Sequence, residues 1–138
     1  MRKNKGFTLI ELTIVLALLA IIAAIVIPTF ILTTDRARLR ADANSALAIQ
    51  RSMELYRIEQ GRVVAGNSVD EMLQNLVAAG YVDSLNVVIQ SQGAFWQLYQ
   101  GGIVVNISQS PEAVHRAFTS LRPDEQIHIR GGVVAAGG

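Results

Sequence analysis

The chain has 138 residues, enough for one domain and one further segment, and no cysteine, which excludes disulfides and thiolate metal sites. Its composition is 51% hydrophobic with much of that in residues 7–32, so residues 62–138 remain for a compact domain of modest size. The net charge is +1, but without Arg2, Lys3 and Lys5 nine Arg face eleven Asp and Glu, or −2, which excludes the clustered cations of a nucleic-acid-binding surface. Both lysines lie in the first six residues, so the body cannot supply the amine of a lysine-linked covalent polymer.

Residues 7–32 have the length and composition of a membrane-spanning helix. The stretch from Leu12 to Leu32 carries no charge, and as a helix it would be roughly 30 Å long, which is the thickness of a hydrocarbon core. Each Phe, Leu, Ile or Val favours insertion by about 0.3–0.6 kcal/mol, against a cost of about 3 kcal/mol for one acid at mid-membrane. Insertion is therefore predicted despite Glu11, which lies near one end.

Two simple interpretations of this segment leave Glu11 unexplained. A secretory signal peptide has an apolar region of about 7–15 residues and an A-x-A-like cleavage site, whereas this run is longer and contains no A-x-A spacing. A permanent signal anchor fits the length. An acid inside a membrane segment is a functional hypothesis that needs a partner, and no basic residue lies between Glu11 and Arg36. We therefore expect no partner nearby in the same helix.

The stretch KGFTLIE, residues 5–11, resembles the class III signal of type IV prepilins and type II secretion pseudopilins. The resemblance extends over roughly residues 1–60. It implies that a prepilin peptidase, which is also an N-methyltransferase, cleaves between Gly6 and Phe7 and methylates the new amine of Phe7. Glu11 then matches the acid five residues into the mature chain, and Pro28 matches a proline that many members carry.

The same resemblance implies a partner for Glu11. Cleavage creates a cationic amine on Phe7, and a charge in an apolar environment is tolerated only when it is paired. The Phe7 amine of one subunit and Glu11 of a neighbour could satisfy each other and set the register of a filament. The family further implies a cytoplasmic leader and an assembly platform with an ATPase in the inner membrane. Charge counting does not decide the orientation, because three cations flank each side of the span.

Residues 35–59 read as a continuation of the same helix. An apolar stripe lies along one face, with Arg38 and Asp42 as an i,i+4 pair on its flank. The stripe is made of Leu39, Ala43, Ala46, Leu47, Ile49, Met53 and Tyr56. Gly61 suits the left-handed position that ends a helix, and Pro28 favours a kink within it.

Beyond Gly61 the pattern changes to short elements. A helix is predicted over residues 68–80, with Ser68 and Glu71 as a capping box, and another from Ser110-Pro111-Glu112 to about Leu121. Strands are predicted at Leu85–Gln90, Phe95–Gln100, Ile103–Ile107, Gln126–Arg130 and Val133–Ala136, with hairpin turns at 91–94, Gly101-Gly102 and Gly131-Gly132. The predicted fold is α+β: a long N-terminal helix packed on a small C-terminal antiparallel sheet with short helices, which is the pilin plan.

Four segments are expected from these patterns. They are a removable leader (1–6), a hydrophobic membrane and filament-core helix (7–32), its amphipathic continuation (33–61) and a globular antiparallel-sheet head (62–138).

The head shows little sign of catalytic or metal chemistry. His115 and His128 lack the spacing of paired metal ligands, and we predict both to be ordinary surface histidines. The doublet Asp124-Glu125 is weak evidence for the calcium site of major pseudopilins, and a solvated turn is the better interpretation. Motifs of nucleotide-binding loops and serine hydrolases are missing from the sequence. We expect a protein that is not an enzyme, with no catalytic residues, cofactor or metal.

Aromatic residues gather on one predicted strand. Alternation places Trp96 on the face opposite Phe95 and Tyr99. One of these faces belongs in the core, and the other could be a subunit contact.

The predicted function is that of a structural subunit, polymerised without covalent links into a type IV pilus-like filament with itself and related pilins. A type II secretion pseudopilin or a minor or competence pilin is the nearest alternative, although Arg62-Val63-Val64 departs from the Tyr-Pro-containing stretch of major pseudopilins. A signal-anchored extracytoplasmic enzyme or binding domain is a more distant one. The expected location is the inner membrane for the precursor, and an extracellular or periplasm-spanning filament after assembly.

Overall fold

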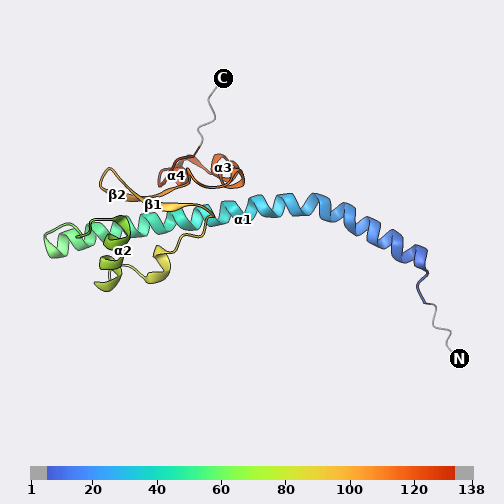
Figure 1. The fold of residues 1–138 in the computed structure, drawn as a ribbon, viewed down its shortest axis with the longest axis horizontal. Helices are drawn as coiled ribbons and strands as arrows, with labels where there is room; N and C mark the ends of the chain where they lie inside the picture. The colour runs from blue at the N-terminus through green and yellow to red at the C-terminus, as the bar shows by residue number, and fades with distance from the viewer. Residues whose placement is uncertain (1–5, 133–138) are drawn as a thin grey trace, which may run out of the picture. The chain divides into compact units, whose positions relative to one another are not determined.

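A computed structural model describes residues 6–132, which form two compact units, the arm (residues 6–31) and the head (residues 32–132). The helices are α1 (Leu9–Gln60), α2 (Val69–Ala78), the 3₁₀ helix η1 (Ser84–Val87), α3 (Glu112–Thr119) and α4 (Pro123–Gln126). The strands are β1 (Phe95–Tyr99), β2 (Gly102–Asn106) and β3 (Ile129–Arg130). Figure 1 labels β1 and β2 alongside α1 to α4.

Helix α1 supplies the whole arm and the first element of the head. It ends where the sequence predicts, because Gly61 adopts a left-handed φ of +66° and donates its N–H to the Arg57 carbonyl over 3.0 Å. Pro28 lies inside the helix, and the kink expected there stays a prediction.

Within the head, one face of α1 is buried. Residues three or four apart share a side of a helix, and the buried set follows that spacing: Leu39, Asp42, Ala43, Ala46 and Ile49. Met53 and Tyr56 continue the same face and pack partly buried against the core. The predicted apolar stripe is therefore the docking face for the rest of the head.

Asp42 does not occupy the flank position predicted for it. It is fully buried, and Arg38 lies 3.7 Å from Asp35 instead. The two Asp42 carboxylate oxygens accept hydrogen bonds from the backbone N–H groups of Gln90 and Ser91, each over 2.8 Å. Because a carboxylate that receives two backbone donors is well satisfied away from water, this contact outweighs an exposed ion pair. Asp42 thus fastens the segment before β1 to α1.

The strands β1 and β2 form the predicted antiparallel hairpin. Its turn residues are Gln100 and Gly101, with φ of +50° and +80°, one position earlier than the predicted pair Gly101-Gly102. Two successive left-handed residues are typical of the type I′ turn, whose twist matches that of the strands.

The third strand makes the sheet mixed, whereas the sequence predicts an antiparallel one. Val105 of β2 lies opposite Ile129 of β3 in a parallel pair. The connection between the two strands contains α3 and α4, and a crossover of this length returns the chain in the same direction. Residues 126–130 are mostly not a strand, because Pro123 starts the short helix α4 and only two residues pair.

The strand predicted at Leu85–Gln90 is also wrong. Asp83 accepts a hydrogen bond from the Leu85 N–H over 2.9 Å and starts η1 in its place. Such an Asx cap competes locally with strand pairing. The predicted strand Val133–Ala136 lies outside the described residues, so the hairpin expected at Gly131-Gly132 remains untested.

The two predicted helices of the head are present. Ser68 caps α2, accepting from the Glu71 N–H over 3.2 Å, while the Glu71 side chain accepts from Asn67 rather than from Ser68. Helix α3 follows Pro111, which occupies the capping position before the helix rather than its first turn.

Two apolar clusters meet at Trp96 and hold the head together. The first joins α1 to the sheet and α3, through Leu39, Ala43, Ala46, Val105, Ile107, Val114, Ala117, Leu121 and Ile129. The second joins the later turns of α1 to α2, through Ile49, Val64, Leu73, Leu76, Val82 and Ile103. Each fully buried Val, Leu or Ile contributes about 1.5–3 kcal/mol, so these clusters are the main stabilising term of the head.

Candidate assembly site

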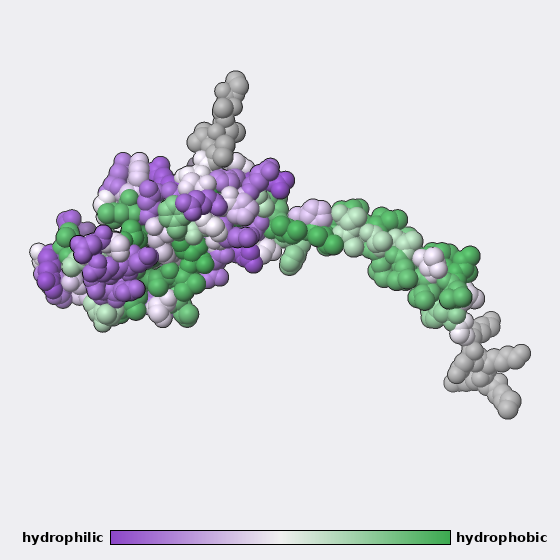
Figure 2. All heavy atoms as spheres, viewed as in Figure 1, coloured by the Kyte–Doolittle hydropathy of each residue, from purple (hydrophilic) through white to green (hydrophobic). Residues whose placement is uncertain are grey.

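The arm exposes its apolar surface all round. Every Phe, Leu, Ile and Val from Phe7 to Leu32 is exposed, and Figure 2 shows the arm covered by apolar residues. By length and composition, α1 is able to cross a membrane, and none of its most apolar window is buried. A surface of this kind requires lipid or other apolar helices as its neighbours.

Glu11 has a partner in its own helix, contrary to the prediction. Its Oε2 accepts from the Thr8 backbone N–H over 2.8 Å and from the Thr8 hydroxyl over 3.0 Å. The Thr8 hydroxyl in turn accepts from the Glu11 N–H over 3.3 Å. This is a reciprocal capping box at the first turn of α1. The sequence signal was present, because Thr8 and Glu11 have the T-x-x-E spacing that precedes an apolar run.

The capping box leaves Glu11 able to bind a second group. Both hydrogen bonds from Thr8 end on Oε2, and Oε1 accepts none from residues 6–132. The side chain is exposed. The cap therefore holds the carboxylate at the start of the helix and leaves Oε1 without a hydrogen bond from residues 6–132.

Gly6 is not required by the fold. A side chain at this position would meet nothing within 4 Å, and its backbone is not left-handed. Glycines that a fold needs usually sit at a positive φ or at a close approach. The structure thus gives no packing reason for glycine before Phe7.

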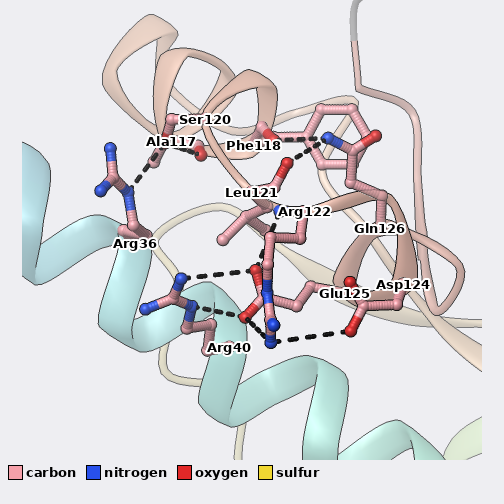
Figure 3. Close-up of polar contacts among 10 residues, drawn as sticks. All are labelled: Arg36, Arg40, Ala117, Phe118, Ser120, Leu121, Arg122, Asp124, Glu125 and Gln126. Carbon is pink, nitrogen blue, oxygen red and sulfur yellow. Dashed lines mark hydrogen bonds and ion pairs between the residues drawn. The ribbon is translucent and has the colours of Figure 1, made fainter.

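The head places the acidic doublet differently from the prediction. Glu125 lies 2.8 Å from the Arg40 guanidinium and accepts from the Arg122 N–H over 2.9 Å. Figure 3 shows Arg40 reaching from α1 to Glu125, with Arg122 on the same carboxylate. The Arg122 N–H bond and the Arg40 contact hold the pKa of Glu125 below its usual value. Glu125 thus ties α4 to α1, whereas Asp124 remains exposed.

The two histidines are half-buried, whereas the sequence predicts surface positions. His115 Nδ1 is buried and has no partner among the described residues. Among residues 6–132, no group of three or more His, Cys, Asp or Glu side chains is placed to hold a metal ion.

The aromatic strand separates as alternation predicts. Trp96 packs into both apolar clusters and donates its indole N–H to the Val87 carbonyl over 2.7 Å. Phe95 and Tyr99 are exposed, and the Arg130 guanidinium lies 4.1 Å above the Tyr99 ring. Trp96 is therefore the core aromatic of this strand.

Comparisons with known proteins show the family of this chain. Residues 1–27 match the family model of the prokaryotic N-terminal methylation motif. The type IV wide pilus major component of Thermus thermophilus is 31% identical over 137 residues, covering 90% of this chain and 98% of the relative. The chain belongs to the type IV pilin family.

Other relatives match this pilin over shorter stretches. Prepilin peptidase-dependent protein A of Clostridium perfringens is 46% identical over 57 residues, which are 41% of each chain. The type II secretion system core protein G of Klebsiella pneumoniae is 25% identical over 79 residues, covering 57% of this chain and 54% of the relative. A comparison with solved structures finds no match.

Sequence reasoning predicted Gly6, Phe7, Glu11 and Pro28 as the functional residues of this pilin. The structure places the first three together at the start of α1 and Pro28 within it, between the arm's last turns. Sequence reasoning missed Thr8, which binds Glu11 directly.

Proposed function

We propose that this chain is the structural subunit of a type IV pilus-like filament, polymerised without covalent links from a membrane pool. The observation that carries the proposal is the pairing of an apolar helical arm with a carboxylate held at its first turn. The match over 90% of the chain to a major pilus component supports it.

Processing creates the assembly-competent form. A prepilin peptidase and N-methyltransferase cleaves between Gly6 and Phe7 and methylates the new amine. Support comes from the family model that covers residues 1–27, from the prepilin peptidase-dependent relative and from the lack of a packing role for Gly6. Residues 1–6 then act only as a leader peptide that is recognised and removed.

The new amine gives Glu11 its second partner. Oε2 is taken by Thr8, so Oε1 of one subunit binds the Phe7 amine of its neighbour. Inside an apolar bundle an unpaired charge is costly, and removing one member of a buried pair costs about 3–5 kcal/mol. The pair therefore fixes the axial register, while the rest of residues 7–32 supplies apolar packing. The kink at Pro28 lets the arm adapt to that packing.

The remaining partners and compartments follow from this life cycle. The precursor is held in the inner membrane by residues 7–32, and an assembly platform with an ATPase extracts it. Residues 33–61 and 62–138 form the part that lies outside the membrane, in an extracellular or periplasm-spanning filament.

A pseudopilin of type II secretion is the second candidate, favoured by the similarity to core protein G over about half of each chain. A minor or competence pilin is a further form of the same class. The longer match to the wide pilus component favours the pilus subunit. A signal-anchored extracytoplasmic binding domain is the distant alternative.

One experiment tests the proposal directly. Surface filaments are sheared from cells, and their main component and its N-terminus are identified by mass spectrometry. We expect abundant chain that starts at N-methylated Phe7. Retention of Met1–Gly6 on the mature protein would contradict the processing step and support the anchored domain. Loss of the leader without abundance in filaments would support a pseudopilin or minor subunit.

A further inference from the structure

A groove opens between α2 and η1 on the head. It holds about 520 Å³ and is lined mainly by apolar side chains. Its lining includes Leu73 and Val77 of α2, Val87 of η1 and Trp96 of β1. The hydrogen bond from the Trp96 indole to the Val87 carbonyl fixes one wall. The groove is thus a preformed apolar hollow within the head.

The rim of this groove is acidic and apolar. Asp70 lines it, and Asp83 immediately precedes the lining residue Ser84. Beside it, Leu85 is 77% exposed and Val88 is 53% exposed. Neither acid has an ion-pair partner among residues 6–132. The groove therefore suits an apolar ligand that carries positive charge.

A surface of that composition lies on the other side of α1. Leu55 is 48% exposed and Ile58 is 71% exposed. At about 100° per residue they lie on the side away from buried Ile49 and partly buried Met53 and Tyr56. These two side chains form a projecting pair, here named the knob.

Charges of both signs lie beside the knob, but its two acids are engaged within the head: Glu54 lies 3.8 Å from Arg57, and Glu59 accepts from the Tyr81 hydroxyl over 2.6 Å. Arg51 lies one turn before Leu55 on the same stripe, and Arg62 follows the end of the helix. Both are exposed, and neither forms an ion pair within the described part of the chain. The knob and the groove are thus both apolar and lie beside charges of opposite sign that are unpaired among residues 6–132, but they face different sides of one head.

We propose that the knob of one copy, Leu55 and Ile58, docks in the α2–η1 groove of the next copy, with Arg51 and Arg62 against Asp70 and Asp83. Because the two surfaces differ, the contact is heterologous, and such contacts build rings or open helical filaments rather than closed pairs. The inference rests on the proposed filament function and adds a head-to-head contact to the register set by the arms.

Cysteine cross-linking in the full chain tests this contact. The chain has no cysteine of its own, so Ile58→Cys with Ser84→Cys places one thiol on the knob and one in the groove. Each change made alone reports the cross-links between like sites, position 58 to position 58 or position 84 to position 84. Sheared filaments of this double variant are oxidised and resolved without reductant. The matched control combines Ile58→Cys with Glu112→Cys, an exposed position at the start of α3 and outside the groove.

We expect a ladder of dimers, trimers and longer species from the knob–groove pair, about tenfold or more above the control pair, because neighbours held in contact have effective concentrations in the millimolar range. Ile58→Cys and Ser84→Cys on separate, co-expressed chains should give dimers only. Filaments that form normally but cross-link no better than the control overturn the contact and leave the filament function intact. Absence of filaments from the wild-type chain overturns the filament function, and the contact with it.

Charge reversal supplies a second measurement. Arg51→Glu and Asp70→Arg should each reduce the amount of sheared filament several-fold, and the two changes in one chain should restore it. A double variant as poor as the product of the single variants would contradict the charge pairing.

Discussion

In this pilin the same helix α1 exposes its apolar side chains in the arm and buries one face in the head. In the arm every large apolar side chain of α1 is exposed, and the charged residue, Glu11, lies at the first turn. In the head one face of α1 is buried, and its buried polar group is Asp42, satisfied by two backbone donors of the same chain. The arm therefore depends on neighbours outside the chain, whereas the head completes its own packing.

Glu11→Ala should have the largest effect, because the arm has no other acid. We expect membrane levels to be unchanged and filament yield to fall by about a hundredfold, since an unpaired buried charge costs at least about 3 kcal/mol. Cell fractionation measures the first quantity and shearing with immunoblotting the second. Glu11→Gln is the control, because it keeps an acceptor for the Thr8 cap without the charge. Wild-type assembly of the Gln variant would show that the cap, and not the charge, is the essential element.

Asp42→Ala should destabilise the head while leaving the chemistry of the arm unchanged. Two backbone N–H groups would lose their acceptor, and each buried unsatisfied donor costs about 1–3 kcal/mol. We therefore expect the free energy of unfolding to fall by about 2–4 kcal/mol. Denaturant unfolding of the full chain in detergent, followed by the fluorescence of Trp96, measures the change. Glu54→Ala, which removes only the exposed ion pair with Arg57, should stay within about 0.5 kcal/mol, and an equal loss in the two variants would contradict the anchoring role of Asp42.

Substitutions in the hairpin turn should lower the free energy of unfolding less than Asp42→Ala does. Gly101 adopts a φ of +80°, and a side chain there would meet no neighbour, so Gly101→Ala isolates the cost of the left-handed backbone. We expect a loss of about 1 kcal/mol in the same unfolding measurement. Gln100→Asn, at a φ of +50°, should be neutral or stabilising because Asn tolerates this conformation. A loss from Gln100→Asn equal to that from Gly101→Ala would argue against the type I′ turn.

Substitution of Glu125 should have the smallest effect on stability, visible only in how the unfolding midpoint depends on pH. Its pKa is lowered by the Arg122 N–H bond and by Arg40, so the folded state favours the ionised form. The resulting stability is present above the ordinary carboxyl pKa of about 4.3 and is lost as the pH falls through the lowered pKa. Glu125→Gln should therefore reduce the acid-induced decrease in unfolding midpoint, and Asp124→Gln should do so less. Identical acid profiles for the two variants and the wild type would show that this contact contributes nothing to stability.

The parts predicted correctly from the sequence are those encoded locally. The apolar run of α1, its end at Gly61, the cap at Ser68 and the hairpin between β1 and β2 all depend on residues within a few positions of one another. The T-x-x-E capping box of Thr8 and Glu11 is also local and visible in the sequence. It was missed because only a basic residue was considered as the partner of Glu11. In the candidate site, Gly6, Phe7 and Glu11 were predicted from one short motif, and their roles stay predictions.

The sequence by itself determined the arm: its length, its uniform apolarity and the acid at its start follow from composition and from helical spacing. Only the tertiary structure decided the parallel pairing of β3, the burial of Asp42 and the engagement of Glu125. The donors on Asp42 lie 48 and 49 residues away along the chain, and Arg40 lies 85 residues from Glu125. Helix and strand periodicities report neighbours within a few positions, so such partners emerge only when the chain closes around α1. The same limit hides the groove beside η1, because its lining comes from α2, η1 and β1.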